Sequence, residues 1–121
     1  MDIRRVVPDI STNHMEESVK FYTELFGFQV VMDMTWIVTL ASPSNVTAQI
    51  NLLKTQSLSP QQPGLALSIE VADVDVVHAK AVALGMKIIY PLTNEPWGVR
   101  RFHVADPNNV IINVMMHQNK Y

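Results

Sequence analysis

The two halves of this 121-residue chain carry the same order of secondary-structure signals, and this duplication restricts the fold more than any other feature. In each half an apolar, strand-like segment precedes an amphipathic helix, and the helix stops at or near a glycine, Gly27 or Gly85. Sequence rich in β-forming residues follows each glycine. The pattern therefore predicts a βαβββ unit that is used twice.

The two helices are the clearest predicted elements. The first is expected over residues 14–26, with Asn13 as its N-cap and Glu16 as the capping-box partner. The second is expected over residues 74–84, with Asp73 as its N-cap. The spacing of apolar residues predicts these inward-facing side chains: Met15, Val19, Tyr22 and Phe26 in the first helix, with Phe21 and Leu25 beside them, and Val74, Val77, Ala81 and Leu84 in the second.

Eight strands are predicted around the helices from apolar alternation and turn residues. They are expected at residues 3–10, 29–33, 36–40 and 48–54 in the first half, and at 65–71, 87–90, 100–104 and 110–115 in the second. We therefore predict a single domain of two modules, at about 1–55 and 65–117. The linker, at about 56–64, is rich in Ser, Gln and Pro.

Composition excludes several classes of protein. Hydrophobic residues make up 48% of the chain and charged residues 17%, which is typical of a globular protein. The chain has no cysteine, and this excludes disulfides and thiolate chemistry. With a net charge of −2 and scattered basic residues, nucleic-acid binding is not expected. No apolar run reaches the ~18 residues of a membrane span, and no signal peptide is recognisable, so we expect a cytoplasmic protein without membrane contact.

The most distinctive local sequence lies near the end of the chain. A Pro96-Trp97-Gly98 turn leads into a strand, an Asp106-Pro107-Asn108-Asn109 turn follows, and Asn113 interrupts the apolar run after it. Together with Ser18-Val19-Lys20-Phe21-Tyr22 and Val71-Ala72-Asp73-Val74-Asp75, this pattern resembles the vicinal oxygen chelate superfamily, which includes glyoxalase I, bleomycin-resistance proteins and extradiol dioxygenases. The resemblance covers nearly the whole chain. It implies an α+β fold in which two βαβββ modules form a curved mixed sheet around a cavity, and it implies a homodimer.

The resemblance also implies where a metal ion would bind. Metalloenzyme members usually take one ligand from the first strand and one from the last strand of each module. Here those positions fall on Val7, Asn51, Ala66 and Asn113, with Gln49 as the alternative to Asn51. Valine and alanine cannot coordinate a metal, and neutral amides are weak ligands. Asp9 and Glu70 are the nearest acids. We therefore expect neither a metal site of the superfamily type nor a cofactor.

The same positions predict a binding surface for an organic molecule. Period-2 alternation places amide and hydroxyl groups on the concave face, where they can donate and accept hydrogen bonds. Two tryptophans offer stacking platforms, and an arginine lies just beyond the second of them. The predicted ligand-binding residues are Trp97, Asn113, Asn51, Gln49, Ser68, Trp36 and Arg100. The alternative interpretations are that the tryptophans serve packing, and that Asn51 and Gln49 are solvated or paired with neighbouring polar groups.

Catalytic candidates are few. Because His103 follows Phe102 in a strand, one of the two points into the cavity and the other towards the helix layer. His103 and Glu70 are the only weak candidates for a general base, and a structural role for His103 is the alternative. The other histidines, His14, His78 and His117, are expected at the surface. Glu95 is the best acid near the rim of the cavity, and a surface role is the favoured interpretation of it. Within Arg100-Arg101, one arginine is expected on each side of the strand.

Three functions follow from these observations. The first is a binding protein that sequesters a small drug-like or metabolite-like molecule in a metal-free cavity. The second is an enzyme of lyase, isomerase or dioxygenase type with a divergent metal site or a metal-free site. The third is an assembly role with a vestigial cavity. The binding protein is our leading prediction, with a small organic molecule and a second copy of the chain as its partners.

Overall fold

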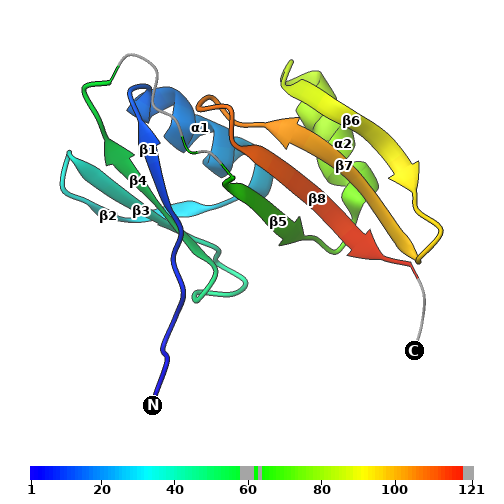
Figure 1. Ribbon diagram of the computed structural model, residues 1–121, viewed down its shortest axis with the longest axis horizontal. Helices are drawn as coiled ribbons and strands as arrows, with labels where there is room; N and C mark the ends of the chain where they lie inside the picture. Colours follow the sequence, from blue (N-terminus) through cyan, green and yellow to red (C-terminus); the bar gives the residue numbers. More distant parts are fainter. Residues whose placement is uncertain (58–61, 63, 119–121) are drawn as a thin grey trace. The chain divides into compact units, whose positions relative to one another are not determined.

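The computed structural model describes residues 1–57, 62 and 64–118, and the chain divides into two compact units, Met1–Pro63 and Gly64–Tyr121. The first contains β1 (Asp9–Thr12), α1 (Met15–Phe26), β2 (Gln29–Asp33), β3 (Ile37–Ala41) and β4 (Gln49–Lys54). The second contains β5 (Ala66–Glu70), α2 (Val74–Ala83), β6 (Lys87–Asn94), β7 (Val99–Ala105) and β8 (Ile111–His117) (Figure 1).

The first unit is a four-stranded mixed sheet with the order β1-β4-β3-β2. β1 runs parallel to β4, and the other neighbours are antiparallel. One face of this sheet packs against α1, and the core between them is fully or almost fully buried. It includes Ile10, Tyr22, Leu25, Leu40 and Leu52.

The second unit repeats this arrangement with the order β5-β8-β7-β6, in which only the β5–β8 pair is parallel. Its helix α2 packs against one face of the sheet (Figure 1). The fully buried residues of this layer include Val74, Ala81, Phe102, Ile112 and Val114. The prediction of an α+β fold built from two βαβββ modules is therefore confirmed, and in the described residues the strands form two separate four-stranded sheets.

The helix caps differ from one another. Asp73 caps α2 as predicted, because its carboxylate accepts hydrogen bonds from the backbone N–H groups of Asp75 and Val76. The N-cap of α1 is His14 rather than Asn13, and no side chain caps this end. The helix ends at Gly27, which has a φ of 74° in the left-handed region that favours glycine.

Two predicted strands have different limits. The first strand begins at Asp9 instead of residue 3, and the segment before it makes only an isolated bridge between Val6 and Ala48. β6 continues past residue 90 to Asn94 and includes Pro91, which an edge strand tolerates because its outward side needs no N–H donor. Most of the predicted linker, at 58–61 and 63, lies outside the described residues. No helix in the described part of the chain has the length and apolarity to cross a membrane.

Candidate functional site

The face of the second sheet that α2 does not cover carries a row of polar side chains. Strand register places Ser68 of β5 beside Asn113 of β8, Asn113 beside His103 of β7, and His103 beside Tyr90 of β6. Phe102 points the other way, because it is fully buried and its ring lies 4.9 Å from that of His78 on α2. The sheet therefore brings together Ser68, His103 and Asn113, three of the predicted site residues. His78 was expected at the surface, and this packing leaves it half-buried against Phe102.

Asn113 is only partly satisfied in this row. Its amide nitrogen donates a hydrogen bond to the Ser68 hydroxyl at 3.2 Å. Its carbonyl oxygen, Oδ1, is buried and has no hydrogen-bond partner among the described residues. A buried carbonyl without a donor costs free energy, on the order of 1–3 kcal/mol. A donor from a bound molecule would remove that cost.

His103 is biased towards its neutral form. Burial lowers the pKa of its imidazole, and the nearby Arg101 guanidinium lowers it further. Glu95 opposes the shift, and so, least of all the influences, does the Asn113 amide opposite His103 on β8, but neither reverses it. The His103 ring also packs against Tyr90, with ring centroids 5.0 Å apart. At neutral pH the row therefore presents an uncharged imidazole.

Next to this row lies a cluster built on Arg101, which we call the Arg101 cluster: Tyr90, Glu95, Trp97 and Arg101. The Glu95 carboxylate accepts hydrogen bonds at 2.8 Å from Arg101 Nε and at 3.1 Å from the Tyr90 hydroxyl. The Arg101 guanidinium carbon lies 5.4 Å from the centroid of the Tyr90 ring and 5.3 Å from that of Trp97. Only 8% of the Glu95 side chain is exposed, so the prediction of a surface role for Glu95 was wrong.

A tight turn presents Trp97 to solvent. The Gly98 N–H bonds to the Glu95 carbonyl at 3.1 Å, and the Glu95 N–H bonds to the Val99 carbonyl at 2.7 Å. Gly98 has a φ of 89°, a conformation that favours glycine. Trp97 is 61% exposed at the tip of this turn. The turn therefore fixes the backbone of Trp97, and Arg101 contacts its ring.

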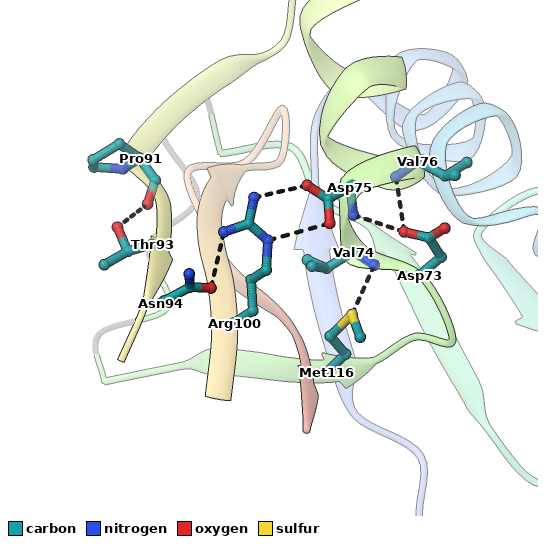
Figure 2. Close-up of polar contacts among 9 residues, drawn as sticks. All are labelled: Asp73, Val74, Asp75, Val76, Pro91, Thr93, Asn94, Arg100 and Met116. Atoms are coloured by element: carbon teal, nitrogen blue, oxygen red, sulfur yellow. Dashed lines mark hydrogen bonds and ion pairs between the residues drawn. The ribbon is translucent and has the colours of Figure 1, made fainter. Parts of the chain in front are cut away.

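Arg100 lies on the opposite side of β7. Its guanidinium forms two hydrogen bonds with the Asp75 carboxylate of α2, at 2.7 and 3.2 Å, and one with Asn94 at 2.9 Å (Figure 2). This ion pair lowers the pKa of Asp75. The expectation that the two arginines occupy opposite sides is thus confirmed. Arg100 lies on the face of the sheet opposite to Asn113. The prediction that Arg100 belongs to the same binding surface as Asn113 is therefore corrected.

The second catalytic candidate, Glu70, is engaged elsewhere. Its carboxylate lies 3.1 Å from His117 Nδ1 at the end of β8, and both side chains are well exposed. In strand register Glu70 pairs with Met115, one pleat beyond the row of Asn113. The structure therefore gives Glu70 a hydrogen-bonding partner at the surface and does not place it beside His103.

The first unit has a comparable row of polar side chains, but these groups form hydrogen bonds with one another. The Asn51 amide nitrogen donates to Asp9 at 2.9 Å, and its carbonyl oxygen accepts from the Thr39 hydroxyl at 2.6 Å. Gln49 bonds to the Arg5 side chain and to the Val46 carbonyl. Trp36 is 56% exposed just before β3. Asn51 and Gln49 are thus paired with protein groups, in agreement with the alternative interpretation of these amides.

The metal ion that the superfamily implies does not fit the residues at these positions. Asn51 uses both polar atoms of its amide on Asp9 and Thr39, so this set does not converge on a cation. In the second unit the equivalent groups are the Ser68 hydroxyl and the Asn113 amide, which bond to each other. Within the described part of the chain, no three His, Cys, Asp or Glu side chains form a group able to hold a metal.

The first unit also contains a groove of about 900 Å³ beside α1. Its lining includes apolar side chains from α1, β2 and β3, namely Met15, Val19, Val30 and Val38, and several charged ones, among them Glu16, Lys20 and Lys54. Met15 and Val19 were predicted to face the core. Tyr22 is buried as predicted, together with Phe21 and Leu25 beside it, but Ser18 is buried in place of Met15 and Val19, so the inward face is turned slightly from the predicted one.

Sequence reasoning missed Tyr90 and Arg101 as members of the site. Arg101 has the same parity as His103 along β7, and this signal identifies its face once the face of His103 is known. No comparable signal exists for Tyr90. Its pairing with His103 depends on register shifts in β6 on either side of it.

Comparisons with known proteins identify the family. The family model for the glyoxalase/bleomycin resistance protein/dioxygenase superfamily matches residues 3–114. The fold is similar to that of TioX from Micromonospora sp. ML1, with a TM-score of 0.77, 19% identity and coverage of 95% of this chain and 99% of that one. It is also similar to a lactoylglutathione lyase from Agrobacterium tumefaciens, with a TM-score of 0.72, 16% identity and coverage of 96% of both chains.

A third similar structure, a protein of unknown function from Agrobacterium tumefaciens str. C58, has a TM-score of 0.72 and 24% identity, with coverage of 96% of this chain and 94% of that one. No curated protein matches the sequence significantly. At these identities the structures show a shared fold. The match to the family model spans most of the chain, and the chain therefore belongs to the glyoxalase/bleomycin resistance protein/dioxygenase superfamily.

Proposed function

We propose that this protein binds a small, uncharged organic molecule on the open face of its second sheet, without a metal ion, and thereby sequesters it. The observation that carries the proposal is the buried carbonyl oxygen of Asn113, which has no partner among the described residues. A hydrogen-bond donor on the bound molecule would satisfy this oxygen. Ser68 and His103, its neighbours across the sheet, add polar groups that can orient the molecule.

The charge balance of this face supports an uncharged molecule. The one acidic group in the Arg101 cluster, Glu95, is neutralised by its ion pair with Arg101. His103 has a lowered pKa and is neutral at physiological pH. Because a charged molecule loses its hydration on binding, it would need an unpaired opposite charge, and this face offers none among the described residues of the row and the cluster.

The test is a thermal-shift screen of uncharged aromatic compounds followed by titration calorimetry of each hit. We expect Asn113→Leu to weaken binding by about tenfold or more, the effect of losing a buried hydrogen bond, while the protein stays folded. Trp97→Ala is expected to weaken binding as well. Asn94→Leu is the matched control, because that amide bonds to Arg100 on the other side of the sheet. Unchanged affinity in both site variants would rule out this face as the binding site.

Metal-free catalysis is the second candidate function, and the neutral state of His103 favours it. An imidazole with a lowered pKa is able to accept a proton at neutral pH. A compound that binds should then be converted by the wild-type protein and remain intact with His103→Gln. Recovery of the intact compound from both proteins after long incubation would leave binding alone as the function.

A further inference from the structure

The geometry points to the Glu95–Arg101 ion pair as a positioning device that holds the exposed ring of Trp97 as a stacking platform, and so selects planar aromatic molecules. The inference rests on the proposed function and adds to it a ligand class and two positioning residues. Trp97 is 61% exposed, and the guanidinium of Arg101 is the group that contacts its ring, at 5.3 Å from the centroid. A ring that is mostly in solvent needs such a contact to keep one orientation.

Arg101 is itself held in place by bonds that fix its plane. Its Nε and Nη2 atoms both lie 2.8 Å from Glu95 Oε2. The same carboxylate oxygen accepts from the Tyr90 hydroxyl, and the Tyr90 ring lies 5.4 Å from the guanidinium carbon. With 26% of the Arg101 side chain and 8% of the Glu95 side chain exposed, water competes weakly for these bonds.

The backbone turn that carries Trp97 supports the same role for Glu95. Glu95 starts the turn on which Trp97 lies, and the backbone of Glu95 closes that turn through its bonds to Gly98 and Val99. One residue therefore positions both the backbone of Trp97, through the turn, and its ring, through Arg101. Lysine cannot replace Arg101 here, because an ammonium group lacks the planar fork that bonds Glu95 and stacks on two rings.

A planar molecule would gain most from this arrangement. An immobilised indole offers a flat, polarisable surface, and stacking on such a ring adds to the free energy gained from the area that it buries. The row of Ser68, Asn113 and His103 lies on the same face, one pleat away in the register of β7 and β8. A flat ring carrying an amide or hydroxyl donor combines stacking on Trp97 with a donor for Asn113.

The positioning role can be tested without any ligand. The chain has two tryptophans, so Trp36→Phe leaves Trp97 as the source of the single indole N–H signal in an ¹⁵N spectrum. In that background we expect Arg101→Lys and Glu95→Gln to lower the ¹⁵N order parameter of the indole from about 0.8 to below about 0.6, the range of a flexible group. Arg100→Lys is the matched control and should leave it unchanged, because Arg100 bonds to Asp75 on the helix side.

The ligand class is tested with 2-naphthamide, a planar ring with an amide donor, and cyclohexanecarboxamide, its smaller non-aromatic counterpart, by titration of the same indole signal. We expect 2-naphthamide to bind more tightly to the Trp36→Phe protein, and Arg101→Lys to remove most of that preference. An unchanged order parameter in Arg101→Lys would overturn the positioning role. A mobile indole with an unchanged preference, or no preference in the parent, would overturn the ligand class. Weakening of cyclohexanecarboxamide by Asn113→Leu would still support the proposed function in that case.

Discussion

His103 shows how a single residue couples the candidate site to pH. Burial and Arg101 lower its pKa from the ordinary value of 6.5, so the unfolded chain binds a proton at a higher pH than the folded protein does. Between the two pKa values the unfolded state holds more protons, and stability rises with pH. His103 therefore destabilises the fold progressively as the pH falls below about 6.5.

We expect His103→Gln to remove this part of the pH dependence, because glutamine does not titrate. The measurement is the free energy of unfolding in urea at pH 7.5 and pH 5, and the difference between the two should be smaller in the variant than in the parent. His14→Gln, at an exposed position before α1, is the control. An equal difference in His103→Gln and the parent would contradict the lowered pKa.

For single residues, the sequence predicted the side of a strand on which a side chain lies better than the groups that the side chain contacts. Alternation placed Arg100 and Arg101 on opposite sides of one strand, but did not show which of them lay near Trp97. That choice depends on partners distant in sequence, Asp75 for Arg100 and Glu95 for Arg101. Asn113 was identified because a polar side chain inside an apolar strand needs a hydrogen-bond partner. In the structure its Oδ1 atom has none among the described residues.

Among the elements, helix α2 depends on its N-cap. The Asp73 carboxylate accepts from the N–H groups of Asp75 and Val76 at 3.1 and 3.3 Å, and these donors have no partner within the helix. We expect Asp73→Ala to lower the free energy of unfolding by about 1 kcal/mol, measured by urea denaturation. Asp73→Asn should stay close to the parent, because asparagine caps almost equally well. Equal losses in the two variants would point to the charge instead of the cap.

The hairpin between β7 and β8 depends on Asp106. Its carboxylate accepts from the backbone N–H groups of Asn108 and Val110, each at 2.8 Å, and the residue is 3% exposed. We expect Asp106→Ala to cost about 1–3 kcal/mol, because two buried donors lose their acceptor. Unfolding in urea measures this cost. Asp106→Asn keeps an acceptor oxygen and should lose less, and a loss as large as that of alanine would contradict this assignment.

The elements were predictable where their signals are local. Periodicity and stop glycines located both helices to within one residue at each end, and turn residues located the last hairpin. The inward face of α1 was predicted for Tyr22 and its neighbours, but the burial of Ser18 was not predictable. Ser18 is fully buried because its hydroxyl lies 3.0 Å from that of Thr12, also buried, and this polar pair is invisible to an apolar pattern. Met15 and Val19 consequently border the groove beside α1.

For the whole molecule, the duplicated order of signals predicted two modules because each module is assembled from neighbours in sequence. The strand order within a module is less local, since β1 pairs with β4 across the helix and two strands, and only the resemblance to the superfamily indicated it. The same limit applies to the second sheet, where β5 pairs with β8. The row of Ser68 and Asn113, which combines two such strands, was therefore predictable only through that resemblance, and the hydrogen bond between the two side chains was found by structure.

The homodimer that the sequence predicts has a specific candidate surface. β2 lies at the edge of its sheet, all five of its residues are exposed, and the segment from β2 to β3 carries several exposed large apolar side chains. These are Val30, Val31, Met32, Met34 and Trp36, with exposures between 39% and 58%. An exposed edge strand with apolar side chains is a favoured surface for association, and each such side chain contributes about 1.5–3 kcal/mol when it is fully buried.

We expect the protein to sediment at about twice its chain mass of 13.6 kDa. Val31→Asp and Met34→Asp should each reduce the sedimenting mass to that of one chain, because a carboxylate buried in the dimer interface would be left without a partner. Val82→Asp is the matched control: Val82 is 57% exposed on α2, as apolar and as accessible as Val31, and far from it in sequence. Sedimentation velocity over a range of concentrations distinguishes the cases. Dissociation by Val82→Asp alone would move the interface to the helix of the second unit, whereas a monomeric parent would show that the apolar edge of β2 stays in contact with water.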